Sequence, residues 1–182
     1  MKINYEIGEK DFLIHQLYLS SQSMRIKKKR TKNEIIPPLI YTLIGIVCYI
    51  KTNNIFIFLG FVSLGILWFL IFPIWERRHY IEHYQSFIHE NYQGRLNQIV
   101  SLEFAEEHLF MQDHSSEGKI LNHSILKIIE LKELVLIQLG VGKNIILPKD
   151  KIDEIDKFTN YLKTWAKDLN IEYEKKQNWK FK

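Results

Sequence analysis

The sequence predicts an α+β membrane protein, in which a two-helix transmembrane hairpin precedes a cytoplasmic antiparallel β-domain that a C-terminal amphipathic helix closes. Three observations predict this fold. The apolar residues concentrate between residues 35 and 75, whereas both flanks have ordinary charged sequence. After residue 94, short segments that alternate apolar and polar residues follow one another with turn residues between them. Residues 152–169, which follow these segments, have apolar residues three and four positions apart, and this spacing is typical of an amphipathic helix.

Residues 1–32 form a cytoplasmic segment in this interpretation. "INYEI" (residues 3–7) alternates as a short strand does, and "EKDFLIHQLYLSSQSM" has the apolar stripes of a helix. We expect this helix to pack on the membrane surface or on the later domain. A basic cluster follows it.

Residues 33–75 predict the hairpin. Residues 55–75 contain no charge, and about 21 residues at about 1.5 Å each span a hydrocarbon core of about 30 Å. No polar stripe marks this segment as a soluble core helix. Residues 35–50 are shorter and carry Pro37 and Pro38, which we expect in the first helical turn, where a missing N–H costs little. Only "KTNN" separates the two segments, so the helices must be antiparallel.

The distribution of basic residues predicts the topology. The positive-inside rule places both termini in the cytoplasm, because the link carries only Lys51 while basic residues flank the other ends of the hairpin. The same residues attract anionic lipid, at about 1 kcal/mol per charge. A nucleic-acid site would need interleaved aromatic residues or a recognition helix, which this cluster lacks, so we expect no nucleic-acid partner. The predicted lipid and topology residues are Arg25, Lys27, Lys28, Lys29, Arg30, Lys32, Arg77 and Arg78.

Small residues in the hairpin permit close helix packing. The sequence is compatible with packing between the helices of one chain and with packing between two chains, so a homo-oligomer is one of the two alternatives. These residues are Gly45, Gly60, Ser63 and Gly65.

Residues 76–93 continue as a helical stalk that Gly94 ends, and residues 94–182 form the β-domain. Predicted strands lie in "QIVSLEF", "HLFMQ", "ELVLIQL" and "IILP", and "GVGKN" is a hairpin turn. Asp150 is the predicted N-cap of the amphipathic helix. We expect the tail "IEYEKKQNWKFK" to be a frayed, solvated end, with contact to a membrane surface as the alternative. The apolar positions of the helix are Ile152, Ile155, Phe158, Leu162, Trp165 and Leu169.

No residue pattern predicts catalysis, a metal site or a cofactor. His79 and His83 share a helix face, but His89 points elsewhere and a zinc site needs further ligands. "GVGKN" fails the phosphate-loop pattern, because Ile137 stands where its first glycine belongs. The segment "EEHLFMQDHSSEG" contains a cluster of polar residues with the composition of a turn, which predicts a polar hairpin tip and no catalytic site. The cluster consists of His108, Asp113, His114 and Ser115.

The chain resembles the YcxB-like family of bacterial membrane proteins. Three features carry the resemblance: the opening "INYEIGEKDFLIHQLYLSSQS" before a basic cluster, the apolar hairpin, and "HSILKIIELKELVLIQLGVGKNIILPKDKI", in which Pro148 and Lys149 are the most specific. Asn122 and His123 stand where the family often has a tryptophan before the serine. The resemblance implies a membrane-tethered β-domain similar to pleckstrin-homology folds, and no chemistry.

We therefore expect a non-enzymatic protein of the bacterial inner membrane. Its cytoplasmic domain would bind an unidentified partner protein or the anionic membrane surface. The alternative is a membrane-resident immunity protein that protects against a cognate toxin, since steric occlusion of a toxin needs no catalytic residue. A membrane-bound enzyme is the third and least favoured hypothesis.

Overall fold

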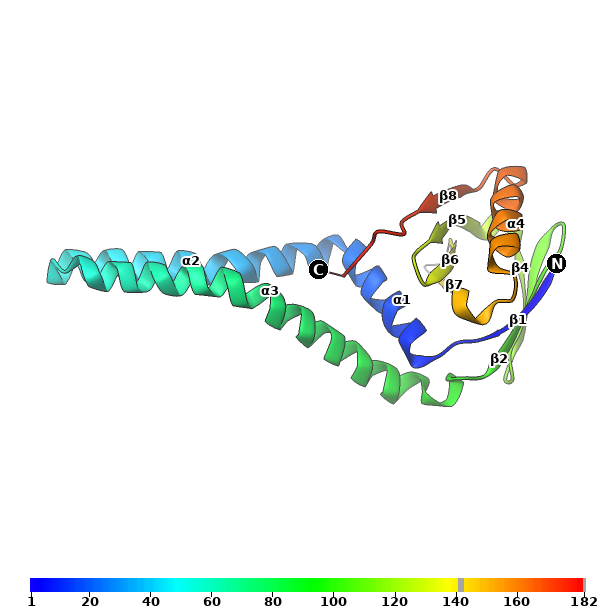
Figure 1. Cartoon of the computed structure of the whole chain (residues 1–182), viewed down its shortest axis with the longest axis horizontal. Helices are drawn as coiled ribbons and strands as arrows, with labels where there is room; N and C mark the ends of the chain where they lie inside the picture. The colour runs from blue at the N-terminus through cyan, green and yellow to red at the C-terminus, as the bar shows by residue number, and fades with distance from the viewer. Residues whose placement is uncertain (141–142, 182) are drawn as a thin grey trace. The chain divides into compact units, whose positions relative to one another are not determined.

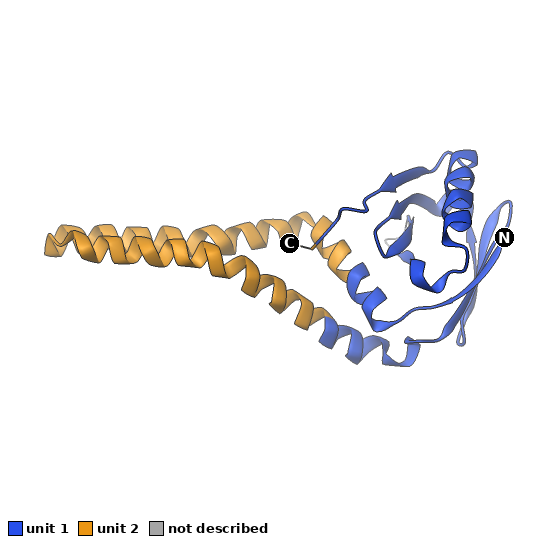
Figure 2. Ribbon diagram, in the orientation of Figure 1, with its two compact units in different colours: residues 1–15, 85–180 blue, residues 16–84, 181–182 orange. Residues whose placement is uncertain are grey.

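The computed structural model describes residues 1–140 and 143–181, and it has α+β structure with two long apolar helices (Figure 1). The chain divides into two compact units (Figure 2). Residues 1–15 and 85–180 form the first unit, and residues 16–84 with Phe181 belong to the second. The predicted turn "GVGKN" includes residues 141–142, which lie outside the described residues.

The first unit contains two four-stranded sheets. One sheet is antiparallel throughout, in the order β1 (Lys2–Glu6), β2 (Ile99–Phe104), β3 (His108–Gln112) and β4 (Glu117–Leu121). The other has the order β7 (Asn144–Pro148), β6 (Leu134–Leu139), β5 (Ile125–Glu130) and β8 (Glu172–Lys175). A short 3-10 turn, η2 (Asn122–Ser124), connects the two sheets between β4 and β5.

Strand β1 belongs to the same sheet as the strands that follow the helices, which the sequence interpretation did not predict. Ile3 lies opposite Leu102 and Tyr5 lies opposite Val100, and all four side chains are buried. The alternation in "INYEI" indicates one buried face, but it carries no information about which strand covers the edge. Residues 1–32 are therefore not a separate segment, since the first of them complete a sheet of the β-domain.

The end of the β-domain differs from the prediction in two places. Asp150 lies in the 3-10 turn η3 (Lys149–Lys151), and α4 (Ile155–Asp168) begins only after Glu154, which has a left-handed backbone with φ 51°. The extended backbone and burial of Ile152 explain why the helix starts later than its apolar spacing suggested. The tail is not frayed at β8, because this strand pairs in parallel with β5.

Burial is deepest at β6 and α4. Residues 134–137 of β6 are buried on both faces, and Phe158, Leu162 and Trp165 of α4 are buried as predicted. Phe104 at the end of β2 makes edge-to-face contacts with Phe158, Tyr161 and Trp165, with ring centroids 5.9, 5.6 and 5.1 Å away.

The helices are α1 (Glu9–Gln22), α2 (Met24–Thr52) and α3 (Ile55–Tyr92), and the 3-10 turn η1 (Gln93–Arg95) follows α3. Helix α3 runs without interruption from the apolar segment to Tyr92. The placement of Pro37 and Pro38 in a first turn is wrong, because α2 begins at Met24. Lys and Arg are good helix formers, so the basic cluster itself is helical and the prolines lie inside the helix.

The predicted short link forms a tight turn. Asn53 adopts φ 51°, and its backbone N–H donates to the carbonyl of Tyr49 at 2.8 Å. Asparagine tolerates this left-handed conformation better than most residues. The Asn54 side-chain oxygen accepts a hydrogen bond from the Phe56 N–H at 3.0 Å and so begins α3. The link therefore ends one helix and starts the next within two residues.

Candidate functional site

The predicted site residues lie on α2 and α3 in the second unit. We call residues 25–37 of α2 and residues 68–80 of α3 the hairpin base. Seven of the eight predicted basic residues are exposed there, and the exception is Arg30; the exposed residues are Arg25, Lys27, Lys28, Lys29, Lys32, Arg77 and Arg78.

Arg30 connects the two helices, which the sequence interpretation missed. Its Nε donates to Glu76 Oε2 at 2.7 Å, and the two side chains are only 21% and 8% exposed. The guanidinium also lies 5.1 Å from the ring centroid of Phe181 and 5.6 Å from that of Tyr80. This contact geometry gives Arg30 a role in helix pairing, which its position in the basic cluster did not indicate.

A proline in α2 creates a hydrogen-bond acceptor for α3. The carbonyl of Asn33 would normally accept from the N–H of residue 37, but that residue is Pro37 and has no N–H. The indole Nε1 of Trp68 donates to this carbonyl at 3.3 Å. The missing intrahelical bond is thereby replaced by a bond between the helices.

A groove with one polar rim lies at the hairpin base. Its volume is about 390 Å³, and Trp68 stacks on Phe72 with ring centroids 5.0 Å apart. Trp75 is 57% exposed, and its ring centroid lies 6.0 Å from that of Phe72. The polar rim comes from α2 and the aromatic wall from α3. The lining residues are Lys32, Asn33, Ile36, Pro37, Trp68, Phe72 and Trp75.

Two of the predicted small residues hold the helices together within one chain. A Cβ at Gly45 would lie 3.0 Å from the Cβ of Phe61, and one at Gly65 would lie 3.5 Å from the Cβ of Pro38. At Gly60 a Cβ would meet nothing within 4 Å. Gly45 and Gly65 therefore permit close approach of α2 and α3, whereas Gly60 lies on an open face.

The histidines noted in the sequence do not converge. His79 stacks on Trp75 with ring centroids 5.4 Å apart, and His83 lies beside Tyr84. Among the residues that the structure describes, no three His, Cys, Asp or Glu side chains lie close enough to hold a metal ion.

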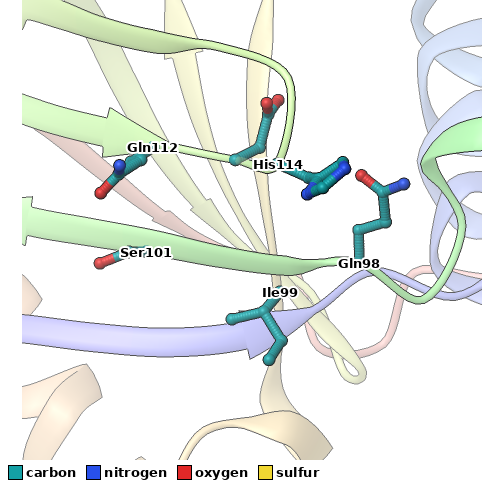
Figure 3. Close-up of a pocket in the computed structure, with 6 residues that line it drawn as sticks. Gln98, Ile99, Ser101, Gln112 and His114 are labelled. Atoms are coloured by element: carbon teal, nitrogen blue, oxygen red, sulfur yellow. The ribbon is translucent and has the colours of Figure 1, made fainter.

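The predicted polar hairpin tip is a turn that Asp113 organises. Its Oδ1 accepts from the backbone N–H of Ser115 at 2.8 Å and of Ser116 at 2.6 Å, and from both hydroxyls. The hydrogen bond from the Ser115 N–H is the largest of the effects that lower the pKa of Asp113. Figure 3 shows the open hollow beside this turn, which has a volume of about 460 Å³. His108 lies on β3 and takes no part in these bonds.

Glu130 and His15 are buried titratable groups of the β-domain whose surroundings were not predicted. Glu130 accepts from Lys149 Nζ at 2.8 Å, Gln177 Nε2 at 2.9 Å and the Tyr173 hydroxyl at 2.9 Å. Burial alone would raise the pKa of Glu130, but these hydrogen bonds outweigh it and lower the pKa to about 2. His15 is buried with Nε2 3.1 Å from Asn144 Nδ2, and burial lowers its pKa to about 4.

Both long helices are long and apolar enough to cross a membrane, and only 11% of the most apolar stretch of each is buried. Most of the large exposed apolar side chains among the described residues lie between residues 35 and 75. No protein-family model, curated protein or solved structure matches the chain.

Proposed function

We propose that this chain is a non-enzymatic protein of the bacterial inner membrane, with α2 and α3 as a transmembrane hairpin and the β-domain in the cytoplasm. The observation that carries the proposal is the unburied apolar surface of the two helices. Side chains such as Leu43, Phe56 and Leu70 are more than 60% exposed. At about 25 cal/mol per Å² of apolar surface, water is a poor solvent for such helices and a hydrocarbon core is a good one.

The sheet pairing supports an even number of membrane crossings. Strands β1 and β2 exchange backbone hydrogen bonds, although α2 and α3 lie between them in the sequence. Two paired strands must lie on the same side of any membrane that the intervening chain crosses. A hairpin satisfies this condition, whereas a single crossing would separate the strands.

The exposed charges support the cytoplasmic orientation of the β-domain. The hairpin base presents seven exposed Lys or Arg side chains, while the link at the other end has only Lys51. Anionic lipid at the cytoplasmic leaflet attracts such a cluster. These features agree with the resemblance to YcxB-like proteins, so membership of that family and a pleckstrin-like β-domain are part of the proposal.

We infer that the β-domain binds a partner protein or the membrane surface and performs no catalysis. The polar groups that could have suggested chemistry already serve the fold. Asp113 organises its turn, and Glu130 is satisfied by three donors. The anchor would keep this domain within reach of anything bound to the inner leaflet.

Site-directed cysteine labelling tests the topology, because Cys48 is the only cysteine in the sequence. In a Cys48→Ser background, Asn54→Cys should react with a membrane-impermeant maleimide on spheroplasts. Ser115→Cys, on the exposed hairpin tip, should react only after the membrane is permeabilised. Equal labelling of both sites before permeabilisation, or recovery of the protein in the supernatant after carbonate extraction, would overturn the proposal.

A further inference from the structure

We propose that the groove at the hairpin base binds one anionic phospholipid, with the lipid phosphate beside Lys32 and an acyl chain against the aromatic wall. This inference rests on the proposed membrane insertion, and adds to it a defined site with one lipid as its occupant.

The lining of the groove selects an amphiphile. Lys32 and Asn33 supply a cation and polar groups at one rim, and the remaining lining side chains are apolar or aromatic. An inorganic phosphate would leave the wall of Trp68 and Trp75 unused, and an uncharged hydrocarbon would leave Lys32 unpaired. A molecule with an anionic head and a long apolar tail satisfies both parts, and basic pockets between helices at the cytoplasmic side bind anionic headgroups.

The charges around the groove are arranged for an anion. Arg25, Lys28 and Lys29 lie seven, four and three residues before Lys32, so they share its face of α2. No ion pair joins any of these four side chains to a carboxylate among the residues that the structure describes. Glu76, the buried carboxylate of the hairpin base, is already neutralised by Arg30 at 2.7 Å. Four exposed cations therefore face the headgroup region without an internal counter-ion.

The aromatic wall is held in place before any lipid binds. The hydrogen bond to the Asn33 carbonyl and the stacking on Phe72 fix the Trp68 ring. Phe72 is only 5% exposed, so the base of the wall is packed. A wall that is already ordered loses little conformational entropy on binding, which favours a specific lipid over diffuse attraction.

Native mass spectrometry of the full-length protein in mild detergent tests the site, with phosphatidylglycerol and phosphatidylcholine as the probes. We expect one phosphatidylglycerol to bind saturably and phosphatidylcholine to bind at least about fivefold more weakly. Lys32→Gln should weaken phosphatidylglycerol binding about fivefold, which corresponds to the loss of one charge contact. Ile36→Trp keeps every charge but fills the groove, and should weaken binding as well.

Lys27→Gln is the matched control, because Lys27 attracts the lipid surface as part of the same cluster but lies five residues before Lys32, on another face of α2, and does not line the groove. Its affinity should stay within about twofold of the unmodified chain. Equal weakening by Lys27→Gln and Lys32→Gln, or equal binding of both lipids, would show diffuse attraction only and overturn the site. Carbonate extraction of the same variants separates the two proposals, since a chain that stays in the membrane but binds no saturable lipid refutes the site alone.

Discussion

At the scale of single residues, the β-domain treats two buried titratable groups in opposite ways. Glu130 stays ionised because Lys149, Gln177 and Tyr173 donate to it. Burial keeps His15 neutral: its Nε2 contacts the Asn144 amide, and its Nδ1 has no hydrogen-bond partner among the described residues. Neither arrangement is visible in the sequence, because the partners lie 19 to 47 residues from Glu130 and 129 residues from His15. The Arg30–Glu76 pair was not predicted for the same reason, since its two residues are 46 positions apart.

Glu130→Ala should lower the free energy of unfolding by about 3 kcal/mol, because it leaves the Lys149 ammonium, whose side chain is only 16% exposed, without its carboxylate partner. Glu133→Ala is the control, since Glu133 forms an exposed ion pair with Lys10 and should contribute less than about 1 kcal/mol. Denaturant unfolding of the full chain in detergent measures both. Because the pKa of Glu130 falls from its ordinary 4.5 to about 2, its contribution is complete above about pH 4.5 and disappears towards pH 2. A loss for Glu130→Ala no larger than that of Glu133→Ala would contradict the assignment.

His15 should make the protein less stable in mild acid. Its pKa is lowered to about 4, so below the ordinary value of 6.5 the unfolded chain binds a proton that the folded chain rejects. Stability should therefore fall as the pH drops from about 6.5 to about 4 and then stop changing through this group. His15→Leu should flatten this part of the pH profile, whereas replacement of the exposed His123 should leave it unchanged. Identical slopes for His15→Leu and the unmodified chain, from thermal unfolding at pH 7 and pH 5, would refute the prediction.

At the scale of elements, the sequence pattern predicted the helices, the short link and strands β1, β2, β3, β6 and β7. It did not predict β4, β5 or β8. The early start of α2 and the late start of α4 were not predicted. The Lys-rich cluster extends α2 back to Met24, while Ile152 stays extended and delays α4. Helix propensity acts through many weak terms, and a buried side chain can override them. The hydrogen bond from Trp68 to the Asn33 carbonyl joins α2 to α3. It could not be predicted from either segment alone, because it depends on how the two helices pack.

Trp68→Phe should cost about 1 kcal/mol, because it removes the indole donor to the Asn33 carbonyl and keeps an aromatic ring. In a Pro37→Ala background the same change should cost much less, since residue 37 then has an N–H that can donate to this carbonyl. A double-mutant cycle, from unfolding in dodecyl sulfate mixed micelles, measures the difference. Equal costs in the two backgrounds would mean that the hydrogen bond does not replace the one that proline removes.

Gly45→Leu should destabilise the hairpin by about 1–3 kcal/mol, because even its Cβ would lie 3.0 Å from the Phe61 Cβ. Gly60→Leu adds the same atoms to an open face and should be neutral or slightly stabilising. The same micelle titration compares them. Equal stability of the two variants would show that α2 and α3 do not pack closely at Gly45.

At the scale of the whole molecule, the sequence predicted which classes of element occur but not how distant strands pair. Two pairings cross long stretches of chain, β1 with β2 and β5 with β8. Both involve short strands whose alternation fits several partners equally well. The candidate site was predicted in part: the exposed cations were identified from their charge, and the groove beside them required the packing of both helices.

Replacing Lys27, Lys28 and Lys29 by Glu should disturb the orientation of the hairpin, because it removes three of the eight flanking basic residues whose excess over the link sets it. Asn54→Cys in this background should lose its labelling from outside in a large fraction of molecules. Glu at the exposed positions Lys132, Lys151 and Lys167 changes the net charge equally and should leave labelling unchanged. An unaltered labelling pattern in the first variant would rule out these lysines as the orientation signal.

The pairing of β1 with β2 also sets an order of events during synthesis. At about 5–20 residues per second, the ribosome completes β2 roughly 5–20 s after β1. The apolar face of Ile3 and Tyr5 has no sheet partner until then, and α2 and α3 emerge in the interval. Closure of this sheet is thus a late step in biogenesis, and a chain arrested before residue 104 would carry an unpaired strand that chaperones and proteases can recognise.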